Sequence, residues 1–224
     1  MKIILLRHVE SQKNITRSFS SDNNSETITD VGESQAECIS KCIYDYINTN
    51  HLCAEYVYCA SSNRAFSTAN ILAKHLQIKV HTTDAFLSVT TDDNLKGKTE
   101  NEVQEINPQF IYELELYRCG LFNAYEYTSV ADVIKTGEYE RQVLNEFYDI
   151  IQRGTETLKI FIMHYSSLTA TLINVARIMG HYPKDFYGKV EFDLGKIYLL
   201  DYSPENHIFN IELANSKPDN LYNC

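Results

Sequence analysis

A short, mostly apolar run that ends in polar residues and leads into a helical pattern occurs three times in this chain. The runs cover residues 2–6, 55–60 and 158–163. Apolar runs of this length are typical of strands that are buried on both faces of a parallel sheet, and their alternation with helices indicates strand–helix–strand units. The sequence therefore predicts an α/β protein with a parallel sheet.

The other predicted elements surround these units. Residues 78–82 form another short β-branched run, and residues 196–202 and 207–213 alternate like a hairpin at the sheet edge. Residues 14–29, rich in Ser, Asn and Thr, are expected to form a loop over the end of the first strand. With 224 residues, the chain is most simply one domain, 1–224, in which residues 89–137 are interpreted as an inserted cap. Helices are expected at residues 29–48, 65–76, 108–116, 129–151 and 168–179.

The formal net charge of −10 bears on the partners of the protein. A chain this negative is not expected to bind nucleic acid or an anionic membrane in general, so a phosphate site has to be a local positive pocket. No apolar run approaches the length of a membrane span, and the N-terminus enters a strand without the regions of a signal peptide, which predicts a cytoplasmic location. The six cysteines include no CxxC pair and are expected to be reduced thiols.

Basic side chains follow each of the three apolar runs, at the point where the strand ends. Arg7 and His8 follow the first run, Arg64 the second and His164 the third. Singly, Arg64 could pair with a surface carboxylate and His164 could be a core histidine. Carboxyl ends of parallel strands, however, meet at one edge of the sheet, where ligands of open α/β sheets bind. Two guanidinium groups, two imidazoles and the following helix N-termini can surround a phosphoryl group, and an imidazole can act as its nucleophile.

Further blocks of sequence accompany these residues. They are Leu6-Arg7-His8-Val9-Glu10-Ser11 with Asn14 six residues after the histidine, Phe19-Ser20-Ser21, Thr29-Asp30-Val31-Gly32-Glu33-Ser34-Gln35-Ala36, Ser61-Ser62-Asn63-Arg64-Ala65-Phe66-Ser67-Thr68-Ala69, and His164 directly after a strand. In these blocks and their order, which span most of the chain, the sequence resembles the histidine phosphatase superfamily, also called phosphoglycerate mutase-like.

The resemblance implies a three-layer α/β/α sandwich with a mostly parallel central sheet, in which His8 attacks phosphorus to form a phosphohistidine. It implies that no metal and no other cofactor is required. The remaining site residues would bind the substrate: Arg7, Arg64 and His164 complete the phosphate pocket, Asn14 adds a side-chain donor, and Ser20 lies near the substrate. Independently of the resemblance, the helix N-terminus after Tyr165 is expected to add backbone N–H groups at this site.

The sequence departs from the family pattern at three positions. The family usually has Gly after each of its two site histidines, where this chain has Val9 and Tyr165, so a tighter or slightly reshaped pocket is expected. The family's proton donor follows the pattern Asp, two residues, Leu, one residue, Glu. In the segment that begins at Asp84, this pattern places Val89 where the carboxylate should be. The expected general acid is therefore missing from its usual position.

Three interpretations of the missing acid remain open. Asp92 or Asp93, in the polar stretch a few residues further on, could replace it. Alternatively, the substrate has a good leaving group that needs little protonation, since general acid catalysis contributes roughly two to four powers of ten for a poor one. In the third interpretation, the protein is a non-catalytic or weakly active phospholigand-binding protein.

The cap is shorter and less basic than a mutase is expected to need, which favours hydrolysis over mutase chemistry. The sequence therefore predicts a metal-independent phosphoric monoester hydrolase that acts on a small phosphorylated metabolite. The oligomeric state is left open, a homodimer included.

Overall fold

The computed structural model describes residues 1–19, 26–88, 93–118, 138–180 and 193–212. Its centre is a six-stranded sheet with the order β3-β2-β4-β1-β5-β6. The first four of these strands run parallel to one another, and β5 and β6 form an antiparallel hairpin on the β1 side. The expected mostly parallel sheet with an edge hairpin is confirmed. The strands are β1 Lys2–Arg7, β2 Tyr56–Ala60, β3 Lys79–Thr83, β4 Leu158–Met163, β5 Ile197–Ser203 and β6 Ile208–Glu212.

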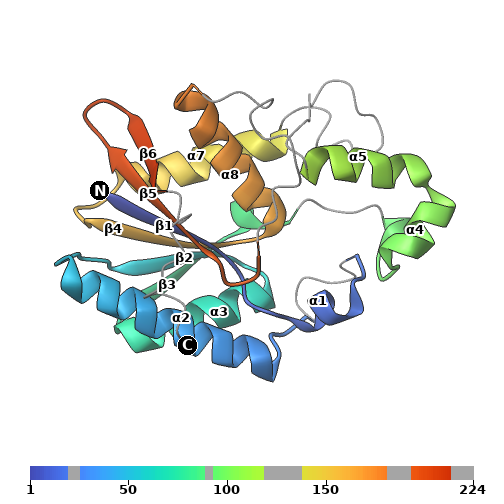
Figure 1. Ribbon diagram of the computed structural model, residues 1–224, viewed down its shortest axis with the longest axis horizontal. Helices are drawn as coiled ribbons and strands as arrows, with labels where there is room; N and C mark the ends of the chain where they lie inside the picture. The colour runs from blue at the N-terminus through green and yellow to red at the C-terminus, as the bar shows by residue number, and fades with distance from the viewer. Residues whose placement is uncertain (20–25, 89–92, 119–137, 181–192, 213–224) are drawn as a thin grey trace.

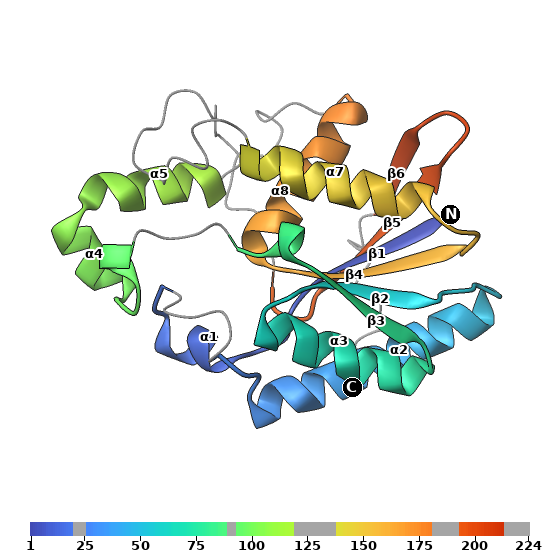
Figure 2. The same ribbon diagram turned by 180° about the vertical axis from the view of Figure 1, so that it is seen from behind.

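Helices cover both faces of the sheet, so the α/β/α layering is confirmed. Figures 1 and 2 show α2 and α3 packed on one face and α7 and α8 on the other. A shorter helix, α1, follows β1, and α4 and α5 lie beyond the carboxyl ends of the strands. The helices are α1 Gln12–Thr16, α2 Asp30–Thr49, α3 Asn63–Leu76, α4 Glu100–Ile106, α5 Pro108–Arg118, α7 Glu138–Gln152 and α8 Tyr165–Ile178.

The register of the two central strands decides where the polar residues behind them lie. Strands β1 and β4 pair in parallel from Lys2 with Leu158 to Arg7 with Met163. The pairing continues one residue further, since the His8 N–H donates to the Met163 carbonyl at 3.1 Å. Residues 8 and 164 therefore leave the sheet at the same level and side by side.

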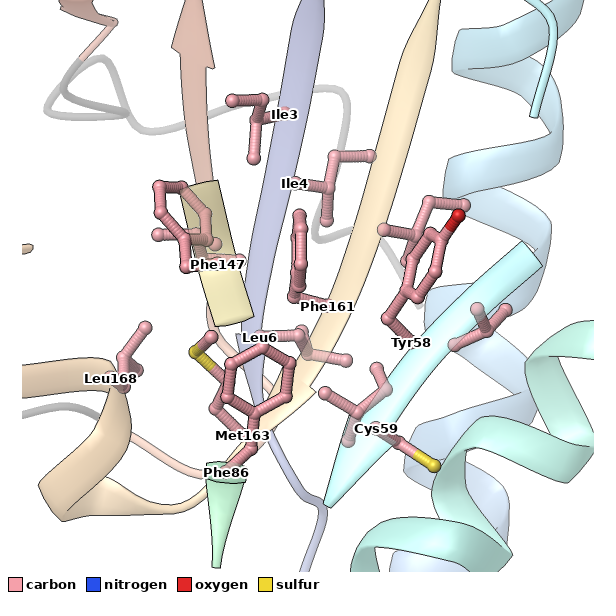
Figure 3. Close-up of a cluster of buried hydrophobic side chains, with 14 of the residues drawn as sticks. Ile3, Ile4, Leu6, Tyr58, Cys59, Phe86, Phe147, Phe161, Met163 and Leu168 are labelled. Atoms are coloured by element: carbon pink, nitrogen blue, oxygen red, sulfur yellow. The ribbon is translucent and has the colours of Figure 1, made fainter. Parts of the chain in front are cut away.

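The core is built on β1 and β4, which are buried on both faces, as their apolar sequences predict. Aromatic rings gather on one side of β4, as Figure 3 shows. The Phe161 ring stacks on Tyr58 with ring centroids 5.5 Å apart and contacts Phe147 and Phe86 at 5.1 and 5.9 Å. Aromatic pairs of this geometry stabilise the fold beyond the burial of their apolar area, so the strands that lead to the polar residues are well packed.

The predicted cap, residues 89–137, is described in part. Residues 93–118 contain a short 3-10 helix, η2 Asp93–Leu95, followed by α4 and α5. A small apolar cluster of Leu95, Val103 and Phe110 packs against Ile173 of α8. The assignment of residues 89–137 as an inserted cap stays a prediction, and the part of the predicted helix 129–151 that precedes α7 lies outside the described residues.

One expectation about the cysteines is wrong. Cys38, on α2, is disulfide-bonded, whereas Cys42, Cys53 and Cys59 are free thiols. Sequence spacing gave no sign of this, because a disulfide requires only that two thiols lie close in space. Among the described helices, none combines the length and the apolar character needed to span a bilayer.

Candidate active site

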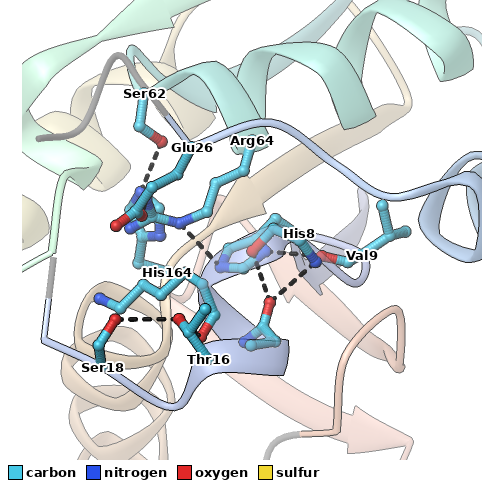
Figure 4. Close-up of polar contacts among 11 residues, drawn as sticks. His8, Val9, Thr16, Ser18, Glu26, Ser62, Arg64 and His164 are labelled. Carbon is cyan, nitrogen blue, oxygen red and sulfur yellow. Dashed lines mark hydrogen bonds and ion pairs between the residues drawn. The ribbon is translucent and has the colours of Figure 1, made fainter. Parts of the chain in front are cut away.

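The three strand ends bring the two histidines and one of the predicted arginines into contact. The rings of His8 and His164 lie edge to face with centroids 5.1 Å apart. The Arg64 Nε–H donates to His8 Nε2 at 3.3 Å, although the two residues are 56 positions apart. Figure 4 shows the three side chains converging from β1, α3 and the start of α8. The convergence expected from parallel strand ends is therefore present.

His8 is held as a neutral ring with one defined acceptor nitrogen. Its Nδ1 lies 2.8 Å from the Val9 carbonyl, which can only accept, so Nδ1 carries the proton. The lone pair is then on Nε2, the atom that accepts from Arg64. Burial, followed by the charges of Arg7 and Arg64, holds the pKa of His8 well below its usual value. The ring is thus unprotonated at neutral pH, which is the form of an imidazole that can act as a nucleophile.

His164 is the N-cap residue of α8 and is 1% exposed. Its Nε2 shares a 2.8 Å hydrogen bond with the hydroxyl of Ser62. Ser62 is the N-cap of α3, but its side chain makes no capping bond there and is used for the histidine instead. Burial and the Arg64 charge lower the pKa of His164 well below its usual value. A neutral His164 can donate one N–H to an anion without adding a charge.

Arg64 is almost fully buried, and its second contact is with a carboxylate. The Arg64 Nη1–H donates to Glu26 Oε2 at 2.5 Å, and the two side chains are 1% and 12% exposed. Sequence reasoning missed Glu26, because it lies in the polar loop expected over β1 and belongs to no motif. Among the described residues, the basic site therefore includes the Glu26 carboxylate.

The two positions where the family pattern has Gly have different consequences in the structure. The Val9 side chain is completely buried in the hydrophobic core. It packs toward Gly32, where an added Cβ would lie 3.3 Å from Val9 Cγ2 and only 2.2 Å from the Glu10 carbonyl. The Tyr165 ring lies below the Arg7 guanidinium, with 5.6 Å between the ring centroid and Cζ, a cation–π distance. Tyr165 thus positions Arg7.

Asn14 lies in α1, near the end of β1. Its Oδ1 accepts from the Ser11 backbone N–H at 3.0 Å and from the Ser11 hydroxyl at 2.6 Å. The amide Nδ2 is then the group that can donate to a ligand. The other candidates cannot be placed in the site: Ser20 and Asp92 lie outside the described residues, and Asp93 is described only as the first residue of η2.

Lys13 is a basic residue that sequence reasoning also missed. Burial, followed by the charge of Arg64, lowers the pKa of Lys13 to about 8, although the Glu26 carboxylate opposes the shift. The Lys13 charge in turn contributes to lowering the pKa of both histidines. Its place directly before Asn14, within the first motif, was the available signal. Two guanidinium groups and this ammonium are thus arranged around two neutral imidazoles, which suits a phosphate dianion.

The Lys13 charge predicts how phosphate binding depends on pH. The ammonium is present below pH 8 and is lost as the pH rises through the pKa of Lys13, while both histidines stay neutral. We expect the affinity for inorganic phosphate, measured by calorimetry, to fall by up to roughly tenfold between pH 8 and pH 9.5. Lys13→Met should bind more weakly and show no such fall, while Lys41→Met, on the exposed face of α2, should behave like the wild type. The same fall in Lys13→Met would contradict the assignment.

Within the part of the chain that the structure describes, no group of three or more His, Cys, Asp or Glu side chains is arranged to hold a metal ion. The groups that converge on the His8 ring are N–H donors and one carboxylate. Such an arrangement can bind a phosphoryl group and place a nitrogen nucleophile against phosphorus.

Comparison with known proteins places this geometry in a family context. The family model of the histidine phosphatase superfamily (branch 1) matches residues 3–210. The fold is similar to that of Bacillus stearothermophilus YhfR (TM-score 0.70, 17% identity, covering 94% of this chain and 95% of that chain). It is also similar to the alpha-ribazole phosphatase from Shigella flexneri (TM-score 0.69, 14% identity, covering 94% of this chain and 94% of that chain). A third similar structure is mycobacterial glucosyl-3-phosphoglycerate phosphatase Rv2419c (TM-score 0.71, 11% identity, covering 95% of this chain and 97% of that chain). No curated protein sequence matches the chain.

Proposed function

The chain belongs to the histidine phosphatase superfamily (branch 1), and from this we propose that it hydrolyses a small phosphorylated metabolite through a phosphohistidine intermediate on His8. The observation that carries the proposal is the contact between Arg64 Nε and His8 Nε2, because it places a fixed cation beside the lone pair of a neutral imidazole. Phosphatase activity is the property named in two of the structural neighbours described above.

The proposed reaction has two steps. In the first, His8 Nε2 attacks phosphorus as the bond to the leaving-group oxygen breaks. In the second, water attacks the phosphohistidine, the N–P bond breaks, and inorganic phosphate is released. Arg7, Arg64 and His164 bind the oxygens, with Asn14 Nδ2 and the backbone N–H groups of α8 from Tyr165 onward as further donors. These preplaced donors stabilise the charge of the transferring group, so we propose that no metal is needed.

The leaving group needs a proton unless it is already a good one. Asp92 and Asp93 remain the acids proposed from the sequence. Support for their region comes from Tyr139, whose hydroxyl donates to the Leu87 carbonyl at 2.8 Å and lies 2.9 Å from Ser166 Oγ. These bonds hold the chain two residues before Val89 against the first turn of α8. Leu87 precedes Asp92 by five positions in the sequence.

A second candidate function is phospholigand binding without catalysis. The observation that favours it is Val89, which cannot donate a proton from the position where the family pattern has Glu. The donor cluster around His8 would bind a phosphorylated ligand equally well in that case. The two functions differ in whether a covalent phosphoryl group forms on His8.

The proposal also covers the organisation of the protein. We infer one domain over residues 1–224, with residues 89–137 as a cap over the site and a cytoplasmic location. The net charge of −10 supports a small-molecule substrate rather than nucleic acid or a membrane as the partner. Ser20, four residues after the end of α1 in the sequence, is proposed to contact the substrate, and a homodimer is compatible with the proposal.

Trapping the intermediate tests the function. The protein is mixed rapidly with an aryl phosphate, quenched in alkali, in which phosphohistidine survives, and digested for mass spectrometry. We expect phosphate on the peptide that contains His8, at a level that decays when unlabelled substrate is added as a chase. The peptide that contains His164 is the internal control and should stay unmodified. Phosphate binding with no modified peptide would support the binding function, and modification of His164 would contradict the assignment of the nucleophile.

A further inference from the structure

We propose that Glu26 is the proton donor to the leaving group, and that substrate brings it into the protonated form by displacing it from Arg64. The inference rests on the proposed phosphatase function and supplies the acid that Val89 cannot provide. It assigns a catalytic role to a residue outside every motif of the sequence.

The first argument is position. Arg64 presents its Nε edge to His8 Nε2 at 3.3 Å and its Nη1 to Glu26 Oε2 at 2.5 Å. The nucleophile and the carboxylate are therefore separated by one guanidinium group and two hydrogen bonds. A phosphoryl group that accepts hydrogen bonds from this guanidinium has the attacking nitrogen near one end and the carboxylate near the other. Figure 4 shows Glu26 and His8 both reaching the Arg64 side chain.

The second argument concerns the other acidic side chains near the strand ends. Glu10 Oε1 accepts from the Thr29 hydroxyl at 2.7 Å, and Asp84 accepts from the Ser61 hydroxyl. Both contacts tie these carboxylates to the start of α2 and to the end of β2. Among the described side chains, Glu26 is the carboxylate that pairs with a guanidinium of the phosphate site.

The third argument is the charge change on binding. The negative charge of Glu26 is balanced by Arg64, and the Lys13 ammonium interacts with both charges. An incoming phosphate dianion takes over the Arg64 N–H groups, so two anions then face each other in a site with little solvent. Like charges this close are stabilised when they share one proton. The site therefore takes up one proton as the substrate binds, either from solvent or with a substrate that enters as the monoanion, and this proton is shared between the phosphoryl group and Glu26.

The proton balance of the two steps is complete without another reactant. As the N–P bond forms and the P–O bond breaks, the Glu26 carboxylic acid gives its proton to the leaving-group oxygen, which departs as an alcohol. Glu26, now a carboxylate, accepts a proton from the attacking water as the N–P bond breaks. Phosphate leaves and the carboxylic acid is restored, or its proton leaves with the phosphate and Glu26 pairs again with Arg64.

The test compares substrates with poor and good leaving groups. For Glu26→Gln, kcat on an alkyl phosphate should fall by roughly 10²–10⁴-fold, whereas kcat on p-nitrophenyl phosphate should fall far less. Glu102→Gln is the matched control: Glu102 accepts from the Thr99 N–H at 2.7 Å in the capping box of α4, a role that Gln also fills. This control should keep the wild-type ratio of alkyl to aryl turnover. Inorganic phosphate binding by Glu26→Gln confirms that the site is folded.

A second variant guards against a purely structural effect. In Glu26→Ala, added formate should restore part of the alkyl turnover by supplying a small carboxylic acid, and it should not change aryl turnover. The inference is overturned if Glu26→Gln keeps the wild-type ratio of alkyl to aryl phosphate turnover. It is also overturned if Glu26→Gln binds phosphate more tightly and turns over faster, because Glu26 would then only compete with the substrate for Arg64. Selective loss of alkyl turnover in Asp92→Asn or Asp93→Asn overturns it in favour of those residues. Absence of turnover in the wild type is a failure of the proposed function itself.

Discussion

Turnover of aryl and alkyl phosphates alike is expected to fall by about 10⁵-fold when His8 is replaced by Ala. The loss should not depend on the leaving group, because the variant lacks the nitrogen that attacks phosphorus in every substrate. Phosphate affinity should change much less, since Arg7, Arg64 and His164 remain in place. Initial rates on both substrates, together with calorimetric titration of inorganic phosphate, give the two quantities.

The controls for this prediction use the geometry around the ring. His75→Ala removes an exposed imidazole of α3 that contacts only the Tyr44 ring in the described structure, and it should keep full activity. Adding Arg64→Ala to His8→Ala should cost little further rate, because the two groups act as one unit. A His8→Ala protein that retains turnover would refute the nucleophile. Equal and negligible rates in the wild type and the variant would instead favour the binding protein.

The largest loss of stability is expected at the opposite end of β4, where a charged pair is buried. Lys159 Nζ donates to Glu156 Oε2 at 2.6 Å and to the Arg153 carbonyl at 2.7 Å, and the side chains of the pair are 1% and 3% exposed. Burial and the Glu156 charge raise the pKa of Tyr58, whose hydroxyl lies 3.4 Å from Glu156 Oε1. Glu156→Ala leaves the ammonium buried without its carboxylate.

The free energy of unfolding should fall by about 3–5 kcal/mol in Glu156→Ala, since an uncompensated buried charge costs that much. For a protein of this size the corresponding fall in Tm is about 6–20 °C, measured by calorimetry or circular dichroism. The exposed pair of Arg153 and Asp149 is the control, and Asp149→Ala should cost less than about 1 kcal/mol. Glu156→Leu combined with Lys159→Met should lose less than Glu156→Ala alone. An equal loss in Asp149→Ala and Glu156→Ala would refute the interpretation.

Much of the fold follows from sequence because its signals are local. The apolar runs of β1 and β4 are typical of strands buried on both faces, and the hairpin of β5 and β6 alternates as an edge hairpin should. The start of α8 was harder to predict. The pattern suggested residue 168, but the helix begins at Tyr165, because His164 takes the N-cap position and its polar neighbours Ser166 and Ser167 fill the first turn.

The site residues that follow strands could likewise be predicted from the sequence, whereas the contact made by Glu26 could not. His8, Arg64 and His164 follow strands, so parallel topology alone brings them to one edge of the sheet. Glu26 reaches Arg64 across 38 positions from a loop without periodicity, and no local pattern encodes such a contact. Val9 shows that a motif position does not reveal which way its side chain points. A residue expected to narrow the site lies in the core instead, because the side chain on the strand extension faces α2.

The order of the strands has a consequence for how the protein responds to heat and to amino-acid substitution. Strands β1 and β4, which directly precede the two histidines, are each paired on both sides, whereas β3 and β6 are the outermost strands of the sheet that the structure describes. Amide protons in such interior strands exchange only when the whole domain opens. The chemical centre should therefore survive until global melting. Substitutions in the outlying helices α4 and α5 should therefore disturb the His8 ring less than substitutions in β1 or β4.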